Sequence, residues 1–370
     1  MRLLVRATNW VGDAVMALPA LRAVRARWPA AHIAILALPY VGEIYQGQEV
    51  ADELLPYDRR GAHAGVRGRE RLAGELRARR FDAALLLQNA FDAAWIAWRA
   101  GIPERIGYRR DARGLLLTRA LPVPRPGEIP AHERFYYLEL VRRAGWLEAL
   151  PESDEIRLQV APGELRLAEE RLSAAGSPGR APRVAVGAGA SYGSAKCWPP
   201  ERFARALNLL RRERQVEVLL FGTAAEAEVS RRILAGLEQP AVDLTGRTAV
   251  RELAPLLACC SVFLGNDSGA MHVAAAAGLP VVAVFGPTDP EGTAPVTRRA
   301  SLIQEKPYCS PCFLRRCPID HRCMTRLRPE RVLEAAEELL ARGASRGGRA
   351  DVAGSHNHSI LLGFSDRQAV

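Results

Sequence analysis

The sequence predicts an α/β protein made of two doubly wound units, each a parallel β-sheet with helices on both faces. Short apolar runs of the kind that form buried strands alternate with longer segments whose apolar residues recur at helical spacing. This alternation occurs twice, on either side of a stretch rich in Pro, Gly and charge between residues 151 and 182. Repeated strand–helix units of this kind form parallel sheets, and their ligands bind at the carboxyl ends of the strands.

The first half opens with a strand, a turn and a helix. Residues 3–7 predict a buried strand, and residues 14–28 predict a helix with one apolar face. The turn between them ends at Asp13 and lacks the G-x-G-x-x-G pattern, which argues against a nicotinamide oxidoreductase. Further strands are expected at residues 32–38 and 81–87, further helices at residues 67–80, 93–100 and 133–144, and an arginine-rich segment at residues 105–119.

The second half repeats the pattern. Strands are expected at residues 184–187, 216–221, 242–245, 261–264 and 281–285, and helices at residues 200–212, 224–237, 250–259, 273–277 and 329–341. We therefore expect an N-terminal domain at residues 1–160, a linker region at residues 161–182 with a helical piece, and a C-terminal domain at residues 183–343. The pattern is lost over residues 344–370, which we expect to be a mobile tail.

Charge and composition restrict the partners. The chain has 370 residues and a formal net charge of +10, which favours an acidic partner: a phosphorylated substrate, a nucleic acid or an anionic membrane surface. Nucleic-acid binding ranks low, because only 6% of the residues are aromatic and the arginines are spread along the chain. No apolar run approaches the ~20 residues that span a bilayer. The N-terminus shows no signal-peptide pattern, so we expect a cytoplasmic protein.

The most informative stretch is Gly265–His272, which lies between an expected strand and an expected helix. Asp267 and Ser268 are residue types that cap helices, and Gly269 lets a backbone approach a ligand closely. A helix that begins here directs free N–H groups and the positive end of its dipole beyond the sheet, which suits a phosphate or diphosphate. The alternative is a capped helix without a ligand.

Four further side chains could carry chemistry. Asp13 could be a general base if burial makes it more basic, or else a first-turn acid that stabilises its helix. Lys196 is one of two lysines in a chain with 49 arginines, and it could bind phosphate as a point charge or be a solvated surface residue. Glu226 could accept hydrogen bonds from ribose hydroxyls or complement a helix dipole. His272 could donate to a diphosphate or be an ordinary helix histidine.

Four cysteines near the C-terminus have the spacing C-x2-C-x4-C-x5-C. Such closely spaced thiols are typical of a structural metal cage, in which zinc would staple a loop. The alternative is a set of reduced thiols without a metal. No H-x-x-E-H or D-x-D pattern points to a catalytic metal. The four residues are Cys309, Cys312, Cys317 and Cys323.

Six segments, taken together, resemble the bacterial lipopolysaccharide heptosyltransferases of glycosyltransferase family 9, most closely the heptosyltransferase II branch. The resemblance runs from residue 1 to about residue 340. The segments are NWVGDAVMALPALRAVRARWP, GASYGSAKCWPPERFA, FGTAAEAEV, DLTGRTAVRELAPLLACC, GNDSGAMHVAAAAGLPVVAVFGPTDP and CSPCFLRRCPIDHRCM.

This resemblance implies the GT-B fold, in which two Rossmann-like domains face each other across a cleft. It implies inverting transfer of L-glycero-D-manno-heptose from ADP-heptose to the inner core of lipid A–core, with no metal or other cofactor at the reaction centre. The lipid acceptor and the positive charge together lead us to expect peripheral contact with the cytoplasmic face of the inner membrane. The competing interpretations are another family-9 enzyme, such as a heptosyltransferase I or III, with a different acceptor, and a basic, metal-stapled nucleic-acid-binding protein.

The resemblance also assigns residues. The catalytic base of the family matches Asp13, and its donor-phosphate lysine matches Lys196, with Ser191 nearby. The carboxylate that binds ribose matches Glu226, and the adenine contact falls at Thr248. The diphosphate turn of the family, D-[ST]-G-x-x-H, matches Asp267, Ser268, Gly269 and His272.

The acceptor side has no matched motif. The implied acceptor carries phosphates and Kdo carboxylates, so charge alone indicates a basic site in the first half. The alternative is a solvated arginine-rich loop. On this basis we expect the acceptor to contact Asn89, Arg109, Arg110, Arg113 and His132.

Overall fold

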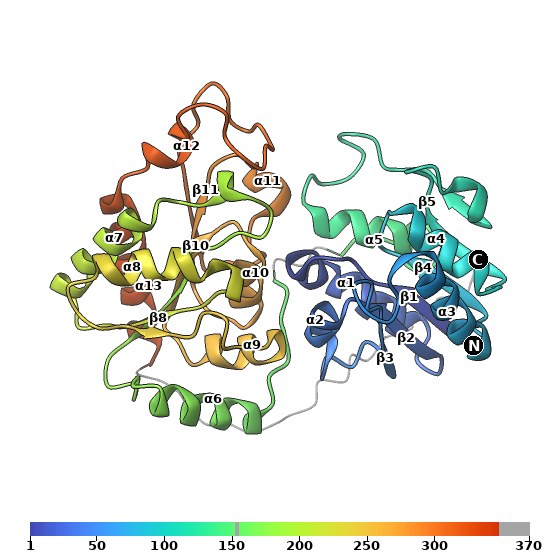
Figure 1. Cartoon of the computed structure of the whole chain (residues 1–370), viewed down its shortest axis with the longest axis horizontal. Coiled ribbons are helices and arrows are strands. Elements are labelled where there is room, and N and C mark those ends of the chain that lie inside the picture. Colours follow the sequence, from blue (N-terminus) through green and yellow to red (C-terminus); the bar gives the residue numbers. More distant parts are fainter. Residues whose placement is uncertain (152–154, 348–370) are drawn as a thin grey trace, which may run out of the picture.

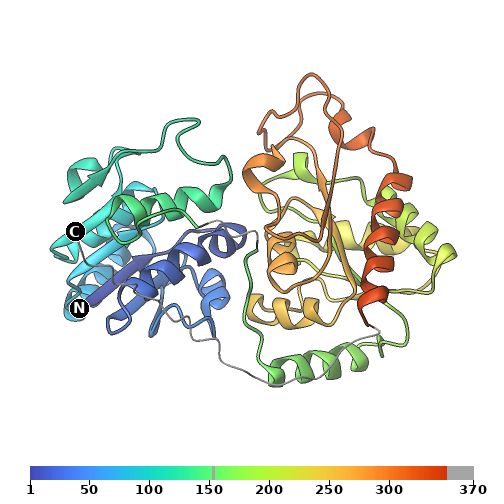
Figure 2. The same cartoon turned by 180° about the vertical axis from the view of Figure 1, so that it is seen from behind.

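The computed structural model describes residues 1–151 and 155–347. Two α/β units lie side by side, each with a parallel sheet of six strands and helices on both faces (Figure 1). Seen from behind, the last helix runs along the outer side of the second unit (Figure 2). The predicted fold class, two doubly wound units in sequence, is confirmed.

The N-terminal sheet consists of β1 (Arg2–Arg6), β2 (His32–Ala37), β3 (Glu53–Pro56), β4 (Ala83–Leu86), β5 (Glu104–Tyr108) and β6 (Arg119–Leu121). Its strand order is β3-β2-β1-β4-β5-β6, and every pair is parallel. The helices of this unit are α1 (Val11–Arg27), α2 (Pro39–Gly42), α3 (Gly65–Ala78), α4 (Phe91–Arg99) and α5 (Glu133–Arg143), with 3-10 turns η1 (Glu43–Tyr45) and η2 (Gly114–Leu116).

The C-terminal sheet consists of β7 (Arg183–Gly187), β8 (Glu217–Leu220), β9 (Val242–Asp243), β10 (Val262–Asn266), β11 (Val281–Phe285) and β12 (Ala300–Gln304). Its order is β12-β11-β10-β7-β8-β9, again parallel throughout. The helices and 3-10 turns of this unit are α6 (Pro162–Ala174), η3 (Ser194–Lys196), α7 (Pro200–Glu213), η4 (Ala224–Glu226), α8 (Ala227–Gly236), α9 (Val250–Ala258), α10 (Gly269–Ala276), α11 (Pro290–Thr293), α12 (Arg322–Thr325) and α13 (Pro329–Gly347). Both sheets therefore share one topology, and their order reverses between β1 and β4 and between β7 and β10.

Four strands were not predicted from the sequence: β3, β5, β6 and β12. They lie at or next to a sheet edge, and each contains residues that are only partly buried, so they lack the continuous buried apolar run that marks a central strand. The arginine-rich segment 105–119 thus contains most of β5 and the start of β6. The last helix reaches Gly347, beyond the expected end at residue 341, and the rest of the predicted tail lies outside the described residues.

The two units are joined by direct packing of α1 against α10. A Cβ added at Gly269 would lie 3.1 Å from Val11 Cβ and 3.3 Å from Gly12 N, and a Cβ at Gly12 would lie 2.9 Å from His272 Cδ2. Glycine at both positions therefore allows the helix starts to approach closely. One apolar core continues from the N-terminal sheet through α1 and α10 to the inner face of the C-terminal sheet.

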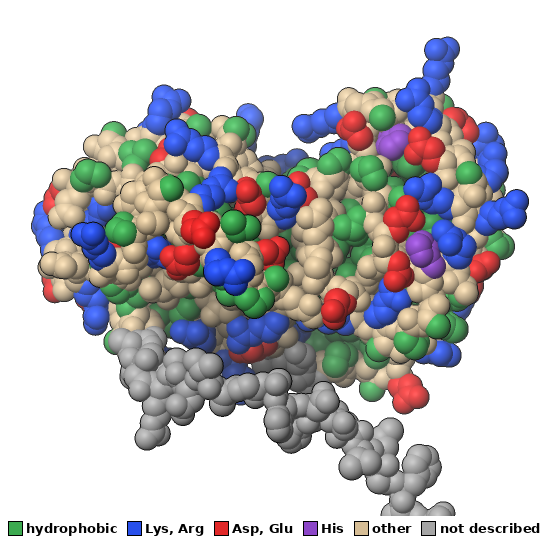
Figure 3. Space-filling model, turned by 90° about the horizontal axis from the view of Figure 1, so that it is seen from below, with side chains coloured by type: hydrophobic (Ala, Val, Ile, Leu, Met, Phe, Trp, Pro, Cys, Tyr) green, Lys and Arg blue, Asp and Glu red, His purple; other side chains and the backbone are tan. Residues whose placement is uncertain are grey.

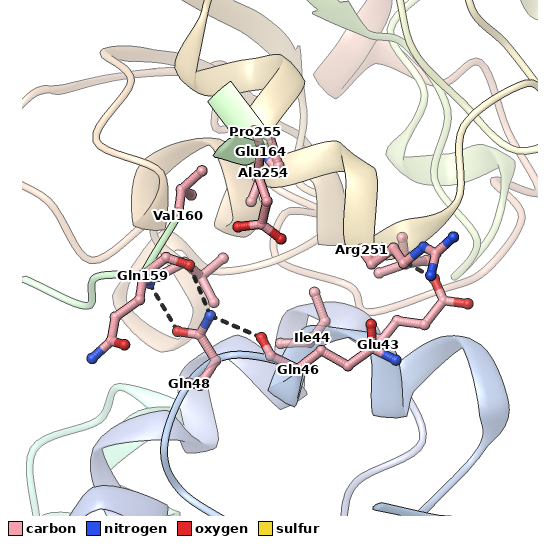
Figure 4. Close-up of a pocket in the computed structure, with 12 residues that line it drawn as sticks. Glu43, Ile44, Gln46, Gln48, Gln159, Val160, Glu164, Arg251, Ala254 and Pro255 are labelled. Carbon is pink, nitrogen blue, oxygen red and sulfur yellow. Dashed lines mark hydrogen bonds between the residues drawn. The ribbon is translucent and has the colours of Figure 1, made fainter. Parts of the chain in front are cut away.

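A polar contact also joins the units, near η1 and α9 (Figure 4). Gln48 Nε2 donates to the Gln159 carbonyl at 3.0 Å, and Gln159 N donates back to Gln48 Oε1 at 2.9 Å. Arg251 N donates to Glu43 Oε2 at 3.0 Å. Each of these two backbone amides is thus bound by a side chain of the N-terminal unit.

The chain has joined the C-terminal unit before it reaches α6. Ile156 N donates to the Val296 carbonyl at 3.2 Å, and Leu158 N donates to the Ala276 carbonyl at 2.8 Å. The helix α6 then packs on α9. The division at residues 160 and 161 stays a prediction. Within the described residues, no helix combines the length and the apolarity that crossing a bilayer requires.

Candidate active site

Three turns that carry predicted site residues meet between the two units. Each follows a strand at a point where the sheet order reverses: Asp13 follows β1, Lys196 follows β7, and Asp267 follows β10. Because α1 packs against α10, the carboxyl edges of the two sheets face each other here (Figure 1). Open α/β sheets bind ligands at this place, so topology and motif agree on the location of the site.

Lys196 and Asp267 form a buried ion pair. Lys196 Nζ lies 2.5 Å from Asp267 Oδ2, and the side chains are 12% and 4% exposed. The hydroxyl of Thr288 donates to the same carboxylate oxygen at 2.7 Å. Lys196 Nζ also lies 4.9 Å from the ring centroid of Tyr192. A lysine held in this way offers a point charge in a fixed position at the end of the sheet.

Asn266, the last residue of β10, positions the loop that carries Lys196. Its buried side chain accepts from Trp198 N at 3.0 Å and donates to the Ala188 carbonyl at 2.6 Å. Both ends of the loop are thereby tied to β10. Asn266 lies in the stretch Gly265–His272 that was singled out from the sequence, whereas Thr288 lies outside it. The available signal in each case was a polar residue at, or within three residues of, the end of a buried strand.

The start of α10 is suited to an anion. Ser268 occupies the N-cap in extended backbone conformation, but its side chain makes no capping hydrogen bond. The Ser268 hydroxyl oxygen is buried and has no hydrogen-bond partner among the described residues. The first turn of α10 contains no acidic residue. The side-chain cap that the sequence left open as an alternative is therefore not made, and the free N–H groups at this helix start suit phosphate oxygens.

His272 lies in the same turn, against Gly12 of α1. Burial lowers its pKa to about 4; Asp267 opposes this shift, whereas His132 and Lys196 add to it. The imidazole is therefore neutral at pH 7 and donates from only one of its nitrogens. Its predicted hydrogen bond to a diphosphate stays a prediction.

Asp13 lies in the first turn of α1, whose N-cap is Trp10. Burial raises the pKa of Asp13 to about 6; the charge of Lys196 opposes the rise, and that of Asp267 adds to it. Asp13 is thus close enough to sense both members of the ion pair on the other unit. A general base at this position has to be at least partly buried, and Asp13 meets that requirement.

The other predicted donor residues surround the same sheet edge. Glu226 accepts from Thr223 N at 2.6 Å and from the Thr223 hydroxyl at 3.0 Å, so it closes a capping box. A Cβ at Gly189 would lie 1.9 Å from Glu226 Oε1, which places this carboxylate against the loop after β7. Ser191 is exposed in that loop, and Thr248 lies just before α9. Their contacts with a donor stay predictions.

The five residues predicted to contact the acceptor have different environments in the structure. Arg113 is fully buried and donates to the Tyr108 carbonyl at 3.0 Å, to Asn89 Oδ1 at 2.8 Å and to the Gln88 carbonyl. It supports the fold here and presents no free guanidinium, which corrects the expectation from charge. Asn89 is occupied by this bond and by a 2.9 Å bond to the Tyr136 hydroxyl. Charge along a sequence does not tell a buried arginine from an exposed one.

The remaining basic residues differ from one another. Arg109 and Arg110 are exposed, and Arg110 pairs with Asp111 and with the Tyr136 hydroxyl. His132 caps α5 and lies 2.8 Å from the Ala294 carbonyl of the other unit, which assigns the proton to its Nε2. On the face shown in Figure 3, Lys and Arg side chains are scattered among acidic and apolar ones.

The four cysteines are not arranged as a metal cage in the described structure. In the part of the chain that the structure describes, no group of three or more His, Cys, Asp or Glu side chains has an arrangement that could hold a metal ion. Cys317 Sγ accepts from His321 N at 3.3 Å, and Cys312 is exposed. Burial raises the pKa of Cys323 to about 11, with a smaller contribution from the other three cysteines. The structure thus favours a protonated thiol at Cys323, and the zinc hypothesis gains no support.

Three comparisons identify the family. The sequence profile of glycosyltransferase family 9 (heptosyltransferase) matches residues 69–322. The chain is 32% identical to lipopolysaccharide heptosyltransferase 2 of Salmonella typhimurium, over 92% of this chain and 99% of that protein. It is 30% identical to the Escherichia coli protein of the same name, over 92% and 99% of the two chains.

A solved structure agrees with this result. The structure of Escherichia coli ADP-heptose lps heptosyltransferase II superimposes with a TM-score of 0.79 at 30% identity, over 93% of this chain and 100% of that one. The fold is GT-B, and the protein is a glycosyltransferase. The chain belongs to glycosyltransferase family 9, the heptosyltransferase family.

Proposed function

We propose that this enzyme transfers L-glycero-D-manno-heptose from ADP-heptose to the inner core of lipopolysaccharide, and that it adds the second heptose, with inversion and without a metal at the reaction centre. One observation carries the proposal. A partly buried carboxylate, Asp13, faces a fixed lysine, Lys196, and an anion-accepting helix start across the two units. The relatives named above support the choice of reaction, because they are heptosyltransferases 2 and match over nearly their whole length.

The C-terminal unit would bind the donor. The diphosphate would lie on the N–H groups at the start of α10, with the Ser268 hydroxyl and Lys196 as further donors. Glu226 would accept from the ribose hydroxyls, and Thr248 would contact the adenine. As the bond between the anomeric carbon and the diphosphate breaks, negative charge develops on the leaving oxygen. Fixed N–H dipoles and one ammonium group stabilise that charge without rearranging.

Asp13 would act from the N-terminal unit, opposite the donor. Its carboxylate accepts the proton of the attacking hydroxyl while the acceptor oxygen bonds to the anomeric carbon, and ADP leaves from the other face of the sugar. A base with a pKa of about 6 is ionised at pH 7 and is more basic than a solvated aspartate. Of the five residues predicted to contact the acceptor, Arg109 and Arg110 are the exposed arginines, and they would bind acceptor phosphates. A heptosyltransferase I or III type of acceptor is the alternative, since no described contact distinguishes these acceptors.

We also propose peripheral contact with the cytoplasmic face of the inner membrane through α4 and η2. Trp98 on α4 is 45% exposed and Leu115 on η2 is 98% exposed, and these two elements are in contact. Arg109 and Arg110 lie just before η2. Apolar side chains flanked by cations fit an anionic lipid surface. The protein should float with anionic vesicles at low salt and less at high salt; no flotation at low salt would contradict the proposal.

The test of the reaction is ADP release from ADP-heptose in excess EDTA. Release is measured with a mono-heptosylated acceptor, with a Kdo–lipid A acceptor that lacks heptose, and without any acceptor. We expect release with the first acceptor to survive EDTA and to fall about 10²–10⁴-fold in Asp13→Ala, the range for a lost general base. Preference for the acceptor without heptose would favour the heptosyltransferase I alternative. Full activity of Asp13→Ala would show that Asp13 is only a first-turn acid.

A further inference from the structure

A second carboxyl group, that of Glu133, lies at the cleft and has no role in the reaction described so far. Glu133 is the first residue of α5, and α5 packs along α1. The residue before it, His132, caps α5 through Nδ1 and binds the Ala294 carbonyl of the other unit through Nε2. The turn that carries Glu133 is therefore attached to both units and has a fixed position beside the reaction centre.

The helix itself does not require a carboxylate at this position. Glu164, Glu226 and Glu252 also lie in first turns, and each accepts a hydrogen bond from the N-cap backbone of its own helix. Glu133 makes no such bond and no ion pair with any described residue. Its hydrogen-bonding neighbour is Tyr137, one turn further along α5. The helix cap here is supplied by His132, so capping does not explain Glu133.

The groups around Glu133 favour its protonated form. Burial, and to a smaller extent the carboxylate of Asp13, raise the pKa of Glu133 to about 7 against the opposing effects of Tyr137 and Arg110. Asp13 in turn faces Lys196 and Asp267 from the other unit, and it acts on the phenols of Tyr45 and Tyr137. Two neighbouring carboxyl groups do not readily ionise together. Near pH 7, Asp13 is the ionised member of the pair, and Glu133 holds the proton on a substantial fraction of the molecules.

We propose that Glu133 is an acceptor-binding residue of this active site: as a neutral carboxylic acid it donates a hydrogen bond to an oxygen of the acceptor sugar, next to the hydroxyl that Asp13 deprotonates. This inference rests on the proposed function. A neutral acid orients the sugar without repelling an acceptor that carries phosphates and carboxylates. It also adds no second negative charge beside Asp13 or beside the departing diphosphate. Proton transfer itself stays with Asp13.

The test is the pH dependence of kcat/KM for the acceptor. For the wild type we expect a narrow bell, with a rising limb near pH 6 from Asp13 and a falling limb near pH 7 from Glu133. Glu133→Gln keeps an N–H donor but cannot ionise, so the falling limb should disappear. At pH 8.5 about 3% of a group with a pKa near 7 is still protonated, so the variant should exceed the wild type there by about tenfold or more, relative to their rates at pH 6.5.

Further variants separate binding from structure. Glu133→Ala removes the donor, so KM for the acceptor should rise about tenfold at pH 6.5, where most of the wild type is protonated at Glu133. The difference from the wild type should shrink toward pH 8.5, and KM for ADP-heptose should stay unchanged. Glu201→Gln alters a first-turn carboxylate of α7 that pairs with Arg232, and it should keep the wild-type pH profile. If Glu133→Gln does not fold, Glu133→Asp replaces it: a repositioned acid should move the falling limb instead of removing it.

The outcomes distinguish the two proposals. A falling limb that persists in Glu133→Gln, with activity still dependent on Asp13, would overturn the role of Glu133 and leave the proposed function standing. An unchanged acceptor KM in Glu133→Ala would do the same. Absence of acceptor-dependent ADP release from the wild type would overturn the proposed function, and the role of Glu133 with it.

Discussion

The first turns of α1 and α10 have the same architecture and opposite electrostatics. Each follows a strand at a reversal of sheet order, neither has a side-chain cap, and the two touch through Gly12 and Gly269. The first turn of α1 contains Asp13, whereas the first turn of α10 contains no acid and has an unpartnered serine hydroxyl. One helix start already holds its own anion, and the other is able to accept one from a ligand.

Burial, not the helix, decides the state of Asp13. The positive end of a helix stabilises a nearby carboxylate by about 0.3–1 kcal/mol, which corresponds to less than one pKa unit. The pKa of Asp13 nevertheless rises from 3.8 to about 6, because desolvation outweighs the dipole and the charge of Lys196 together. The same local structure thus gives a base on one side of the cleft and an anion site on the other, and the difference lies in which residue occupies the first turn.

The largest expected effect comes from removing the cation that supports α10. Lys196→Ala should lower kcat for ADP release by about 10²–10³-fold, the range for losing one preorganised charge-stabilising donor. Lys196→Arg should restore little, because a planar fork replaces a point charge held by Asp267. The control is Lys306→Ala, which removes the other lysine of the chain and should leave activity unchanged. Equal activity of the two alanine variants would remove Lys196 from the site.

A smaller effect should follow from placing an acidic residue at the start of α10, as there is at the start of α1. Ser268→Asp puts a carboxylate where the diphosphate is proposed to bind, so KM for ADP-heptose should rise about 10–50-fold. Folding should not suffer, because an aspartate at an N-cap stabilises a helix. Ser268→Asn, which has the same shape without the charge, should raise KM much less. Calorimetric titration with ADP separates the two, and equal affinities would show that no anion binds at this helix start.

The smallest effect should follow from removing the acidic residue from the first turn of α1, so that it matches the first turn of α10. Because the pKa of Asp13 is raised on folding, the folded state holds the Asp13 proton more tightly than the unfolded chain does. The buried charge therefore destabilises the protein above about pH 6 and has no effect below about pH 4. Asp13→Asn should raise the free energy of unfolding by about 1 kcal/mol at pH 7.5, after allowance for relaxation around the charge, and by nothing at pH 4. Denaturant titration at both pH values checks this, and a pH-independent difference would contradict it.

Short-range patterns predicted the local structure on the C-terminal side of the candidate site well. The strand–turn–helix around Asp267, Ser268 and Gly269 was visible because its residues are consecutive and follow a buried strand. Thr288 was missed because it reaches Asp267 from the loop after β11, over a separation of 21 residues. The short edge strands β3, β6 and β12 were missed for a related reason, since pairing with a neighbour stabilises them more than their own residues do.

The N-terminal side was predicted less well, because the argument there depended on charge. Arg113 and Arg109 look alike in the sequence, yet one is buried among carbonyl groups and the other is exposed. Glu133 gave no signal, since a glutamate at the start of a helix is common. Its position next to Asp13 depends on how α5 packs on α1, and that packing is a property of the tertiary structure alone.

The polar contact between Gln48 and Gln159 makes the separation of the two units measurable. Gln159 N donates to Gln48, and Arg251 N donates to Glu43, so both amide protons are protected by side chains of the opposite unit. Hydrogen–deuterium exchange at these two amides therefore counts how often the units part, with no substrate present. Amides within β10, which is buried in the middle of its sheet, exchange only when that unit itself opens, and they give the internal reference.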